Sequence, residues 1–436
     1  MAEKKISQLT AKGATVADTD LLVISESAGG GAYNTKSVTG ANVKALVTDA
    51  NLTTTDITTN DVSTAKHGFA PKAPNDTTKF LRGDGTWAVP AAGGLTKFTE
   101  AENTSAPNTT VYVDSLTAAG STTNVDVAIV PKGTGAFILD IPDNTTTGGN
   151  KRGANAVDLQ TSRSNAAYVA SGANSTVLGG TSSAATASNA IAGGDRGYAF
   201  GSGSLGFQEA TASGTKSFAF GVRTTASGEG AIALSSDVYG DCIASGANSF
   251  ASGPNNQASG SYAVAFGGYG NRANGYISYA FGYQSHVFGI TGRQSRGYRN
   301  AAEGDCQKSE FFLSVRTTGN TATTLTVAGG AAASTNQVIL SNQSAYRFKG
   351  TIIGKQSGST NAAVWDIDGF IVRGANAAAT TLNVSNVTLV QNTPAWGTPT
   401  LAADTTNGGL QVQVTGAATT NIQWTAVIET TEVIYA

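Results

Sequence analysis

The sequence predicts an all-β fold: an elongated homotrimer with a parallel β-roll stalk, a C-terminal antiparallel β-sandwich or jelly-roll-like domain, and a small mixed N-terminal module. Glycines recur at intervals of seven residues through much of 150–304, as at Gly246, Gly253 and Gly260. Residues 305–436 instead alternate apolar and polar side chains in runs of strand length. A fixed short period indicates stacked structural units, and alternation of period two indicates half-buried strands.

The composition excludes several classes of protein. The 436 residues carry a formal net charge of -2, so nothing electrostatic favours nucleic acid or an anionic membrane as a partner. A hydrophobic fraction of 40% is too high for an intrinsically disordered chain. No apolar run approaches the roughly 18 residues of a membrane-spanning helix, and the start MAEKKISQLTAKG lacks the apolar core of a secretory signal. With Cys242 and Cys306 as its only cysteines, the chain suits folding in a reducing cytosol.

The N-terminal part divides into three segments by texture. Residues 1–50 form a small module with a strand at Leu21–Ile24, and the helical pattern VTGANVKALV has Thr39 as its N-cap. Residues 51–97 are an extended connector rich in threonine, aspartate and proline. Residues 98–149 form a small β module, with strand patterns in TTVYVDSL, NVDVAIVPKG and GAFILDIP.

The repeats of 150–304 have a consistent internal order. In the clearest of them, two large side chains flank an alanine just before a glycine: Tyr198 and Phe200, Phe218 and Phe220, Val264 and Phe266, Tyr279 and Phe281. Since alternate residues of a strand point to opposite faces, one face is large and apolar and the other is small. Two repeats make a coil of about fourteen residues with glycines at its corners, and its lumen has room only for Ala, Gly and Ser. We expect the large side chains to form the core between three copies of the chain.

Residues 305–436 contain strand patterns at regular spacing. They occur in EFFLSV, TTLTV, NQVILS, YRFKGTIIG, AVWDIDGFIV, TLNVSNVTLV, LQVQVTG and IQWTAVIETTEVIY. About eight antiparallel strands of this kind are typical of a sandwich or jelly roll.

Several residues have a functional and a structural interpretation. Arg82-Gly83-Asp84 spells an integrin-type motif, but its glycine-rich surroundings favour a turn. Asp366 and Asp368 lie on one side of a strand. They could be paired carboxylates or a metal site, but a solvent-exposed face of the strand explains them better. His67 and His286 are isolated from other ligand residues. We therefore expect no metal, no cofactor and no catalytic residues.

Two further candidates concern the ends of the predicted domains. Arg293, Arg296 and Arg299 come after the last regular coil. They could cap the open end of the roll by pairing with Glu303 or Asp305 of a neighbouring copy; the alternative is binding of acidic glycans. Trp396, in the loop NTPAWGTPT, could stack on a sugar of a receptor or close the sandwich. The acidic residues of the roll favour surface solubility over catalysis: Asp195, Glu209, Glu229, Asp237 and Asp241.

The segments ASGTKSFAFG (212–221) and ASGSYAVAFG (258–267) resemble the head repeats of trimeric autotransporter adhesins. That resemblance implies a left-handed parallel β-roll in a homotrimer. The seven-residue spacing breaks between Gly228 and Gly246, which indicates an insertion there. An export signal, a membrane-anchoring barrel and a coiled-coil stalk, which the bacterial adhesins need, are not visible.

The flanking segments resemble modules of bacteriophage tail fibres. The similar segments are residues 131–180, which begin PKGTGAFILDIPDNTTTGGNKRGANAVDLQ, then KHGFAPKAPNDTTKFLRGDGTWAVP, and AYRFKGTIIGKQ near the C-terminus. The resemblance implies a non-enzymatic virion fibre, assembled in the host cytoplasm. Residues 1–50 would bind another virion protein of the tail, baseplate or collar, and 305–436 would bind a host-surface glycan or outer-membrane component. The alternatives are a decoration or collar fibre without a receptor, and a tailspike-type glycan hydrolase.

Overall fold

The computed structural model describes residues 19, 21–29, 32–45, 74–90, 97–106, 110–111, 113–120, 122–236 and 238–435, with backbone only for 21–29, 32–35, 44 and 45. His67, Asp237 and much of the predicted connector 51–97 lie outside these residues. The chain divides into two compact units, Met1–Ala128 and Ile129–Ala436. The boundary falls inside the predicted β module 98–149, whose hairpin belongs to the first unit. In the described part, no helix is long and apolar enough to cross a bilayer.

The described part of the first unit contains short antiparallel hairpins and one helix. Its strands are β1 (Leu21–Gly29) with β2 (Ala32–Thr39), β3 (Phe80–Leu81) with β4 (Trp87–Ala88), and β5 (Phe98–Asn103) with β6 (Val113–Ala118). The helix α1 (Gly40–Ala45) begins where predicted, and the Asn42 amide donates to Thr39 Oγ1 at 3.2 Å, which confirms the N-cap. The strand expected in NVDVAIVPKG is absent, since residues 124–133 form no strand.

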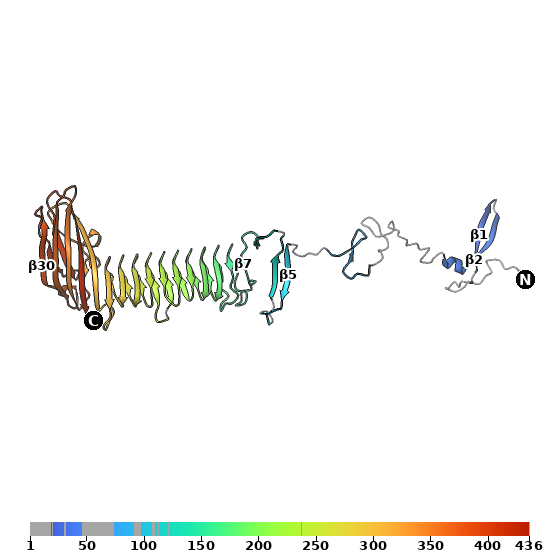
Figure 1. Cartoon of the computed structure of the whole chain (residues 1–436), viewed down its shortest axis with the longest axis horizontal. Coiled ribbons are helices and arrows are strands. Elements are labelled where there is room, and N and C mark those ends of the chain that lie inside the picture. The colour runs from blue at the N-terminus through green and yellow to red at the C-terminus, as the bar shows by residue number, and fades with distance from the viewer. Residues whose placement is uncertain are drawn as a thin grey trace. The chain divides into compact units, whose positions relative to one another are not determined.

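A stack of short coils forms the first half of the second unit (Figure 1). Its longer sheet contains eleven parallel strands: β7 (Phe137–Ile138), β8 (Val157–Asp158), β9 (Thr176–Thr181), β11 (Ile191–Asp195), β13 (Leu205–Phe207), β15 (Phe218–Phe220), β17 (Ile232–Leu234), β19 (Phe250–Ser252), β21 (Val264–Tyr269), β23 (Tyr279–Tyr283) and β24 (Gln294–Tyr298). The shorter sheet contains β10 (Ala184–Ala185), β12 (Tyr198–Ala199), β14 (Ala210–Ala212), β16 (Thr224–Ala226), β18 (Cys242–Ala244), β20 (Gln257–Ala258) and β22 (Arg272–Ala273). We call these the long sheet and the short sheet of the solenoid.

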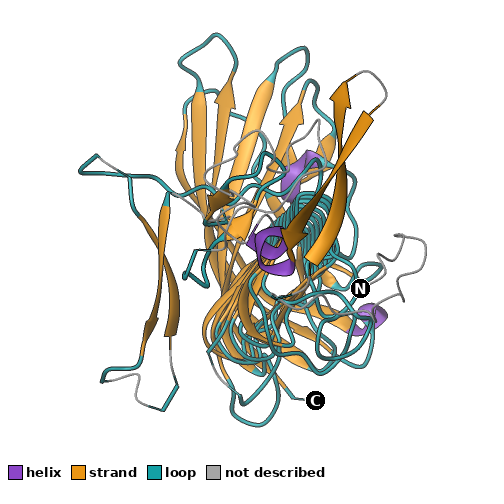
Figure 2. Cartoon of the chain, turned by 90° about the vertical axis from the view of Figure 1, so that its right-hand side faces the viewer, coloured by secondary structure: helices purple, strands orange, loops and turns teal. Residues whose placement is uncertain are grey.

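The pairing register confirms the predicted coil. Phe218 pairs with Ile232, fourteen residues on, and Phe250 pairs with Val264 at the same separation. The insertion expected after Gly228 is present, because Ile232 pairs with Phe250, eighteen residues on. Seen end-on, the coils lie over one another (Figure 2).

Alanine fills the lumen between the two sheets, as predicted. The repeat-motif alanines of the long sheet are fully buried: Ala219, Ala265 and Ala280. Alanines of the short sheet, such as Ala226 and Ala258, meet them from the other side. A larger side chain has no room here, since protein interiors are packed as closely as organic crystals.

The C-terminal domain continues the long sheet in antiparallel form. The strand β25 (Cys306–Thr317) pairs with β24, followed in order by β33 (Ile422–Ile434), β28 (Ser344–Gln356), β29 (Ala362–Arg373) and β30 (Thr380–Asn392). A second sheet contains β26 (Ala322–Thr324), β32 (Gly409–Thr415), β27 (Val338–Ile339) and β31 (Thr400–Asp404). Both sheets contribute to one core, with Trp365 and Trp424 from the first and Leu410 and Val412 from the second.

Candidate interaction surfaces

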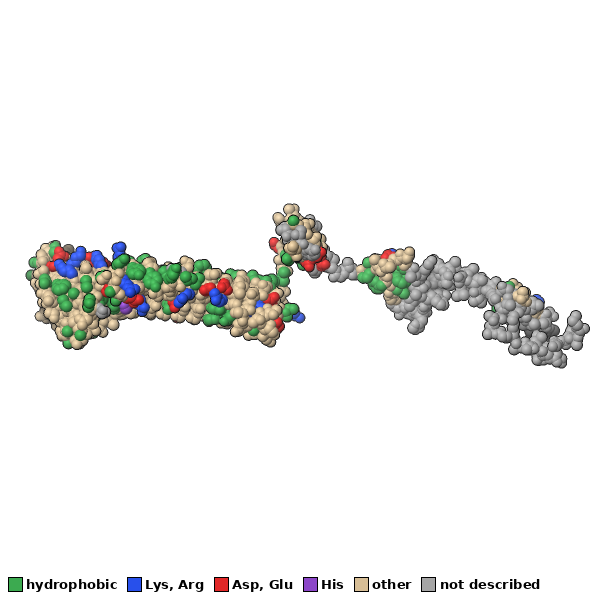
Figure 3. Space-filling model, turned by 90° about the horizontal axis from the view of Figure 1, so that it is seen from below, with side chains coloured by type: hydrophobic (Ala, Val, Ile, Leu, Met, Phe, Trp, Pro, Cys, Tyr) green, Lys and Arg blue, Asp and Glu red, His purple; other side chains and the backbone are tan. Residues whose placement is uncertain are grey.

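An apolar band runs along the outward face of the long sheet. Large side chains succeed one another there from coil to coil: Leu205, Phe207, Phe218, Phe220, Ile232, Leu234, Phe250, Val264, Phe266, Tyr279 and Phe281. Phe220 is 50% exposed and Phe266 is 43% exposed. Phe266 stacks on Phe281 with 5.7 Å between the ring centroids. Hydrophobic side chains gather in a band along the solenoid in Figure 3. We call this the aromatic band.

The prediction that Tyr198 and Phe200 lie on this face was wrong. Tyr198 belongs to β12 and pairs with Thr211 of the short sheet. The coil from Leu205 to Phe218 has thirteen residues, and the YAFG motif of residues 198–201 occupies the half-coil that in several later coils ends in Ala-Ser-Gly. The motif at 198–201 therefore lies on the short sheet, one half-coil away from the position of the other copies. In this coil Leu205 and Phe207 take its place in the aromatic band.

A column of tyrosines stands beside the last coils. Tyr269, Tyr283 and Tyr298 stack from coil to coil, with centroids 5.9 Å and 5.7 Å apart. Sequence reasoning missed this column. Its signal is a Gly-Tyr dipeptide that closes three successive strands of the long sheet, in FGGY, FGY and RGY.

The outward face changes from apolar to charged where the solenoid meets the C-terminal domain. Phe281 pairs with Arg296, Arg296 with Lys308, and further along the same row lie Arg347 and Phe370. These residues are register neighbours across successive strands, so they share one face of one sheet. The aromatic band and the charged face are therefore continuous.

Asp366 and Asp368 lie on this charged face, beside a groove of about 440 Å³ that Lys349 and Glu429 also line. Asp366 accepts a hydrogen bond from Thr351 Oγ1 at 2.8 Å, and Asp368 pairs with Arg347. The hydrogen bonds from Lys308 and Lys349 hold the pKa of Glu429 below its ordinary value. The described residues contain no group of three His, Cys, Asp or Glu placed to hold a metal ion.

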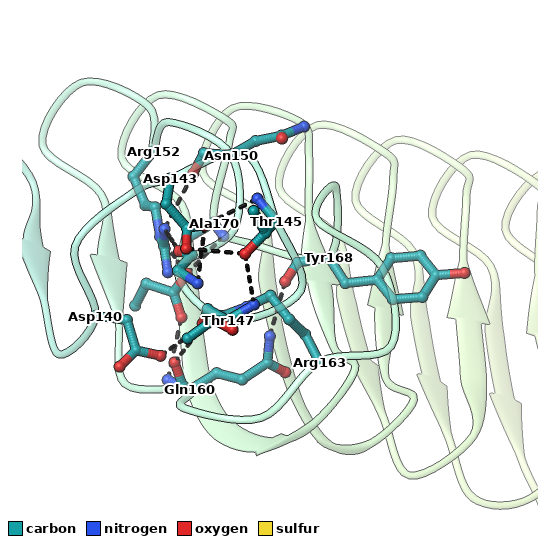
Figure 4. Close-up of polar contacts among 12 residues, drawn as sticks. Asp140, Asp143, Thr145, Thr147, Asn150, Arg152, Gln160, Arg163, Tyr168 and Ala170 are labelled. Carbon is teal, nitrogen blue, oxygen red and sulfur yellow. Dashed lines mark hydrogen bonds and ion pairs between the residues drawn. The ribbon is translucent and has the colours of Figure 1, made fainter.

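Buried polar networks close both ends of the lumen. At the first end, Arg152 Nε donates to Asp158 Oδ2 at 2.7 Å, and both side chains are buried (Figure 4). Gln160 bridges the next coils, because Nε2 donates to Tyr168 O at 2.7 Å and Oε1 accepts from the Ser183 amide at 2.6 Å. The network satisfies the backbone groups that an open end would leave without partners.

Arg293 closes the other end. Its guanidinium is fully buried, pairs with Glu432 of β33 and donates to Ser309 Oγ at 3.0 Å. Arg293 thus caps the roll, as the sequence predicted. The partners predicted for it, Glu303 and Asp305, instead bind other groups of the same chain. Glu303 pairs with Arg272 at 2.7 Å, and Asp305 accepts the backbone amides of residues 300–302. Arg296 and Arg299 do not join this cap.

Trp396 does not offer an exposed ring. It is only 7% exposed and packs edge-on against Trp424, with 5.4 Å between the centroids. Its amide donates to Asn392 Oδ1 at 2.9 Å, which holds the loop against the core. Trp396 therefore fits the structural interpretation, in which it closes the core of the domain. It does not fit the interpretation as an exposed residue that stacks on a receptor sugar.

The remaining candidates have structural partners. The Arg82-Gly83-Asp84 motif is the turn of the β3–β4 hairpin, where Asp84 Oδ1 accepts from the Thr86 amide at 3.0 Å. In the solenoid, Asp195 and Glu209 pair with Arg196, and Asp241 pairs with Arg223. Glu229 lies on the exposed surface of a turn. These acids are placed as the surface interpretation expects.

Comparison with known proteins finds the same repeat. The YadA head domain repeat matches in two copies, at residues 212–234 and 244–269. These residues include both segments that resemble adhesin heads, and the β-solenoid thus contains two YadA head repeats. A sequence search of curated proteins finds no match.

Among solved structures, the chain is similar to the tailspike protein of the Acinetobacter phage vB_ApiP_P1. The identity is 10%, the alignment covers 59% of this chain and 50% of that chain, and the TM-score is 0.19. The match thus spans half the length of the tailspike.

Proposed function

We propose that the chain is the subunit of a homotrimeric, non-enzymatic bacteriophage fibre. Residues 1–50 bind another protein of the virion, and residues 305–436 bind a component of the host surface. The chain is assembled in the host cytoplasm and resides in the virion. The exposed aromatic band is the observation that carries this proposal.

The band exposes large apolar side chains on successive coils, among them Phe220, Ile232 and Phe266. Monomeric proteins rarely expose contiguous apolar patches of more than a few hundred Å². Burying the exposed half of a phenylalanine contributes about 1 kcal/mol to the free energy of association. Each chain of a trimer that meets on this face buries several such side chains. The band is straight and repeats coil by coil, which fits cyclic closure around an axis parallel to the stack.

The solenoid gives the fibre length. Eleven strands of the long sheet are stacked from β7 to β24. At about 4.8 Å between strands, their stack is about 48 Å long. The YadA head repeats and the flanking segments that resemble phage fibre modules support a virion fibre that holds its last domain away from its attachment point.

The oligomeric state tests the proposal directly. The mass of the full chain in sedimentation or native mass spectrometry is expected to be that of a trimer. Phe220→Asp places a charge in the band and is expected to dissociate the trimer, because burying three unpaired carboxylates near one axis is costly. Tyr262→Asp is the matched control, since Tyr262 is equally exposed but lies in a turn outside the band. A monomeric wild type, or a Phe220→Asp trimer as stable as the control, would contradict the proposal.

Host binding is a separate measurement. Labelled full chain is expected to bind some members of a panel of bacterial strains without releasing reducing sugars from their surface glycans. Release of oligosaccharide would assign an enzymatic function instead. A trimer that binds no strain carrying the virion's receptor would favour a purely structural fibre.

A further inference from the structure

A pocket opens between the two sheets of the C-terminal domain, beside the last coil of the solenoid. Its volume is about 460 Å³, and apolar side chains such as Ile290, Ile339 and Leu340 form much of its wall. Arg373 is the one charged residue among those that line it. No ion pair to Arg373 occurs in the described part of the chain, although an arginine in apolar surroundings normally has a counter-ion.

The backbone holds the Arg373 guanidinium from one side only. Nη1 donates to Leu340 O at 2.6 Å and to Gly408 O at 3.2 Å. Gly408 has a φ of +79°, and a Cβ there would lie 2.3 Å from Nη1, so the glycine makes room for the guanidinium. Nε is buried and has no hydrogen-bond partner. The Nε–Nη2 edge, which can grip two oxygens at once, is thus left unused.

A second donor that lines the same pocket is also unused. Ser341 lines the same pocket, and its buried hydroxyl has no hydrogen-bond partner. Burial lowers the pKa of Arg373, and only the Tyr346 hydroxyl opposes that effect. Buried donors without partners cost free energy. A ligand with acceptor oxygens in this pocket would supply the partners that both donors lack.

The charge of the pocket selects the class of ligand. A single guanidinium balances a monoanionic carboxylate and holds it through two parallel hydrogen bonds. A phosphate monoester would bring about two negative charges at neutral pH, and Arg373, the one charged residue of the lining, would balance only one of them. The apolar wall offers the remainder of the ligand a surface for its C–H groups.

We propose that this pocket binds the carboxylate of an acidic sugar of the host surface. The proposal rests on the proposed host-binding role of the domain, which makes a surface glycan the source of the carboxylate. The pocket is compatible with the proposed trimer. Arg373 shares the inner side of β29 with the buried Ile371, whereas Phe370 lies on the outer face that continues the aromatic band.

Calorimetric titration of the full chain tests the site. The probes are glucuronate and N-acetylneuraminate as sugar acids, glucose and N-acetylglucosamine as neutral sugars, glucose 6-phosphate, acetate, and a tripeptide with a free carboxylate. A sugar acid is expected to bind at least tenfold more tightly than every other probe. Equal binding of acetate or of the tripeptide, tighter binding of the phosphate, or no binding of either sugar acid would overturn the proposal.

Variants separate the pocket from the rest of the surface. Arg373→Gln is expected to weaken binding of the sugar acid at least tenfold. Arg373→Lys is expected to weaken it less, because the ammonium keeps the positive charge but cannot donate the two parallel hydrogen bonds of a guanidinium. Arg316→Gln removes an exposed arginine of β25 and is expected to leave binding unchanged. Ser341→Ala keeps the guanidinium and its backbone contacts, and it is expected to weaken binding about threefold. Unchanged affinity in both Arg373→Gln and Ser341→Ala would refute the site.

The outcomes also separate this inference from the proposed fibre function. If the wild-type trimer and the Arg373→Gln trimer bind cells equally well, the pocket is refuted and the fibre remains intact. A monomer that binds sugar acids through Arg373 would support the pocket and refute the trimeric fibre.

Discussion

Gly214 and Gly228 face each other on successive coils so closely that a Cβ on Gly214 would lie 2.0 Å from the carbonyl oxygen of Gly228. The same contact repeats along one corner of the solenoid, from Gly201 to Gly275, at 2.0–2.2 Å. None of these glycines has a positive φ. They are required by the spacing of the coils and not by their backbone conformation.

Substitution within this column is therefore expected to be costly. Gly228→Ala would place a methyl group 2.1 Å from the Gly246 carbonyl oxygen. The coils cannot separate without breaking their strand hydrogen bonds, so we expect a loss of about 3 kcal/mol in the free energy of unfolding per chain. Urea denaturation of the full chain measures it.

Gly330→Ala is the control for this substitution. A Cβ on Gly330 has no atom within 4 Å, and its φ is negative. This variant is expected to match the wild type or exceed it slightly. Equal effects of the two substitutions would show that the column tolerates side chains.

The glycines show how far the sequence specifies the fold. Their period predicted the coil and its corners, and the alanines between them predicted the lumen. The phase of the repeat was ambiguous, because both half-coils accept the same motif. Tyr198 was therefore assigned to the wrong sheet.

Contacts between segments far apart in the chain could not be predicted from the sequence. Arg293 could be recognised as a cap from its position after the last coil. Its partner, Glu432, lies 139 residues later in a strand of the C-terminal sheet. Trp396 similarly had a loop-like local sequence, and only the packing of two sheets shows that its ring is buried against Trp424.

One turn position offers a stabilising substitution. Ile277 has a φ of 49°, and Asn248, at the same position of another coil, has a φ of 54°. A left-handed backbone costs a β-branched residue about 1–2 kcal/mol, whereas asparagine tolerates it. Ile277→Asn is expected to stabilise the chain by about 1 kcal/mol, measured as a rise in Tm. The reciprocal variant Asn248→Ile should lower Tm, and a lower Tm for Ile277→Asn would show that its side chain contributes more than the strain costs.

His286 is expected to make stability depend on pH. Burial, with the charges of Arg272 and Arg293, lowers its pKa from 6.5 to about 4. Between these pH values the unfolded chain binds more protons than the folded chain, so the free energy of unfolding falls as pH drops from 6.5 to 4. The full effect is about 3 kcal/mol per chain.

The variant His286→Phe isolates that contribution. Phenylalanine keeps the stacking on Phe288, whose ring lies 4.1 Å from that of His286. Urea denaturation at about pH 7, 5.5 and 4 should show a difference between wild type and variant that grows as pH falls. A constant difference would mean that His286 is protonated as readily in the folded chain as in the unfolded one.

The buried pair of Arg293 and Glu432 gives the sharpest test of how the C-terminal domain is joined to the solenoid. Both side chains are fully buried, and Glu432 also accepts from Gln307 Nε2 at 2.9 Å and from Thr430 Oγ1 at 2.5 Å. Removing one partner leaves the other charge uncompensated, which costs about 3–5 kcal/mol. Arg293→Met and Glu432→Leu are each expected to lower the free energy of unfolding by this amount.

The double variant distinguishes a charge effect from lost packing. Replacing both partners by apolar residues leaves no unpaired ion, so Arg293→Met with Glu432→Leu should recover much of the loss. Arg223→Met is the surface control, because Arg223 pairs with Asp241 where both side chains are 53% exposed, and it should change stability little. Denaturation of the wild type, the two single variants and the double variant gives the coupling between the two residues. If the double variant were as unstable as the sum of the single ones, the pair would act through its hydrogen bonds to Ser309 and Gln307 and not through its mutual charge.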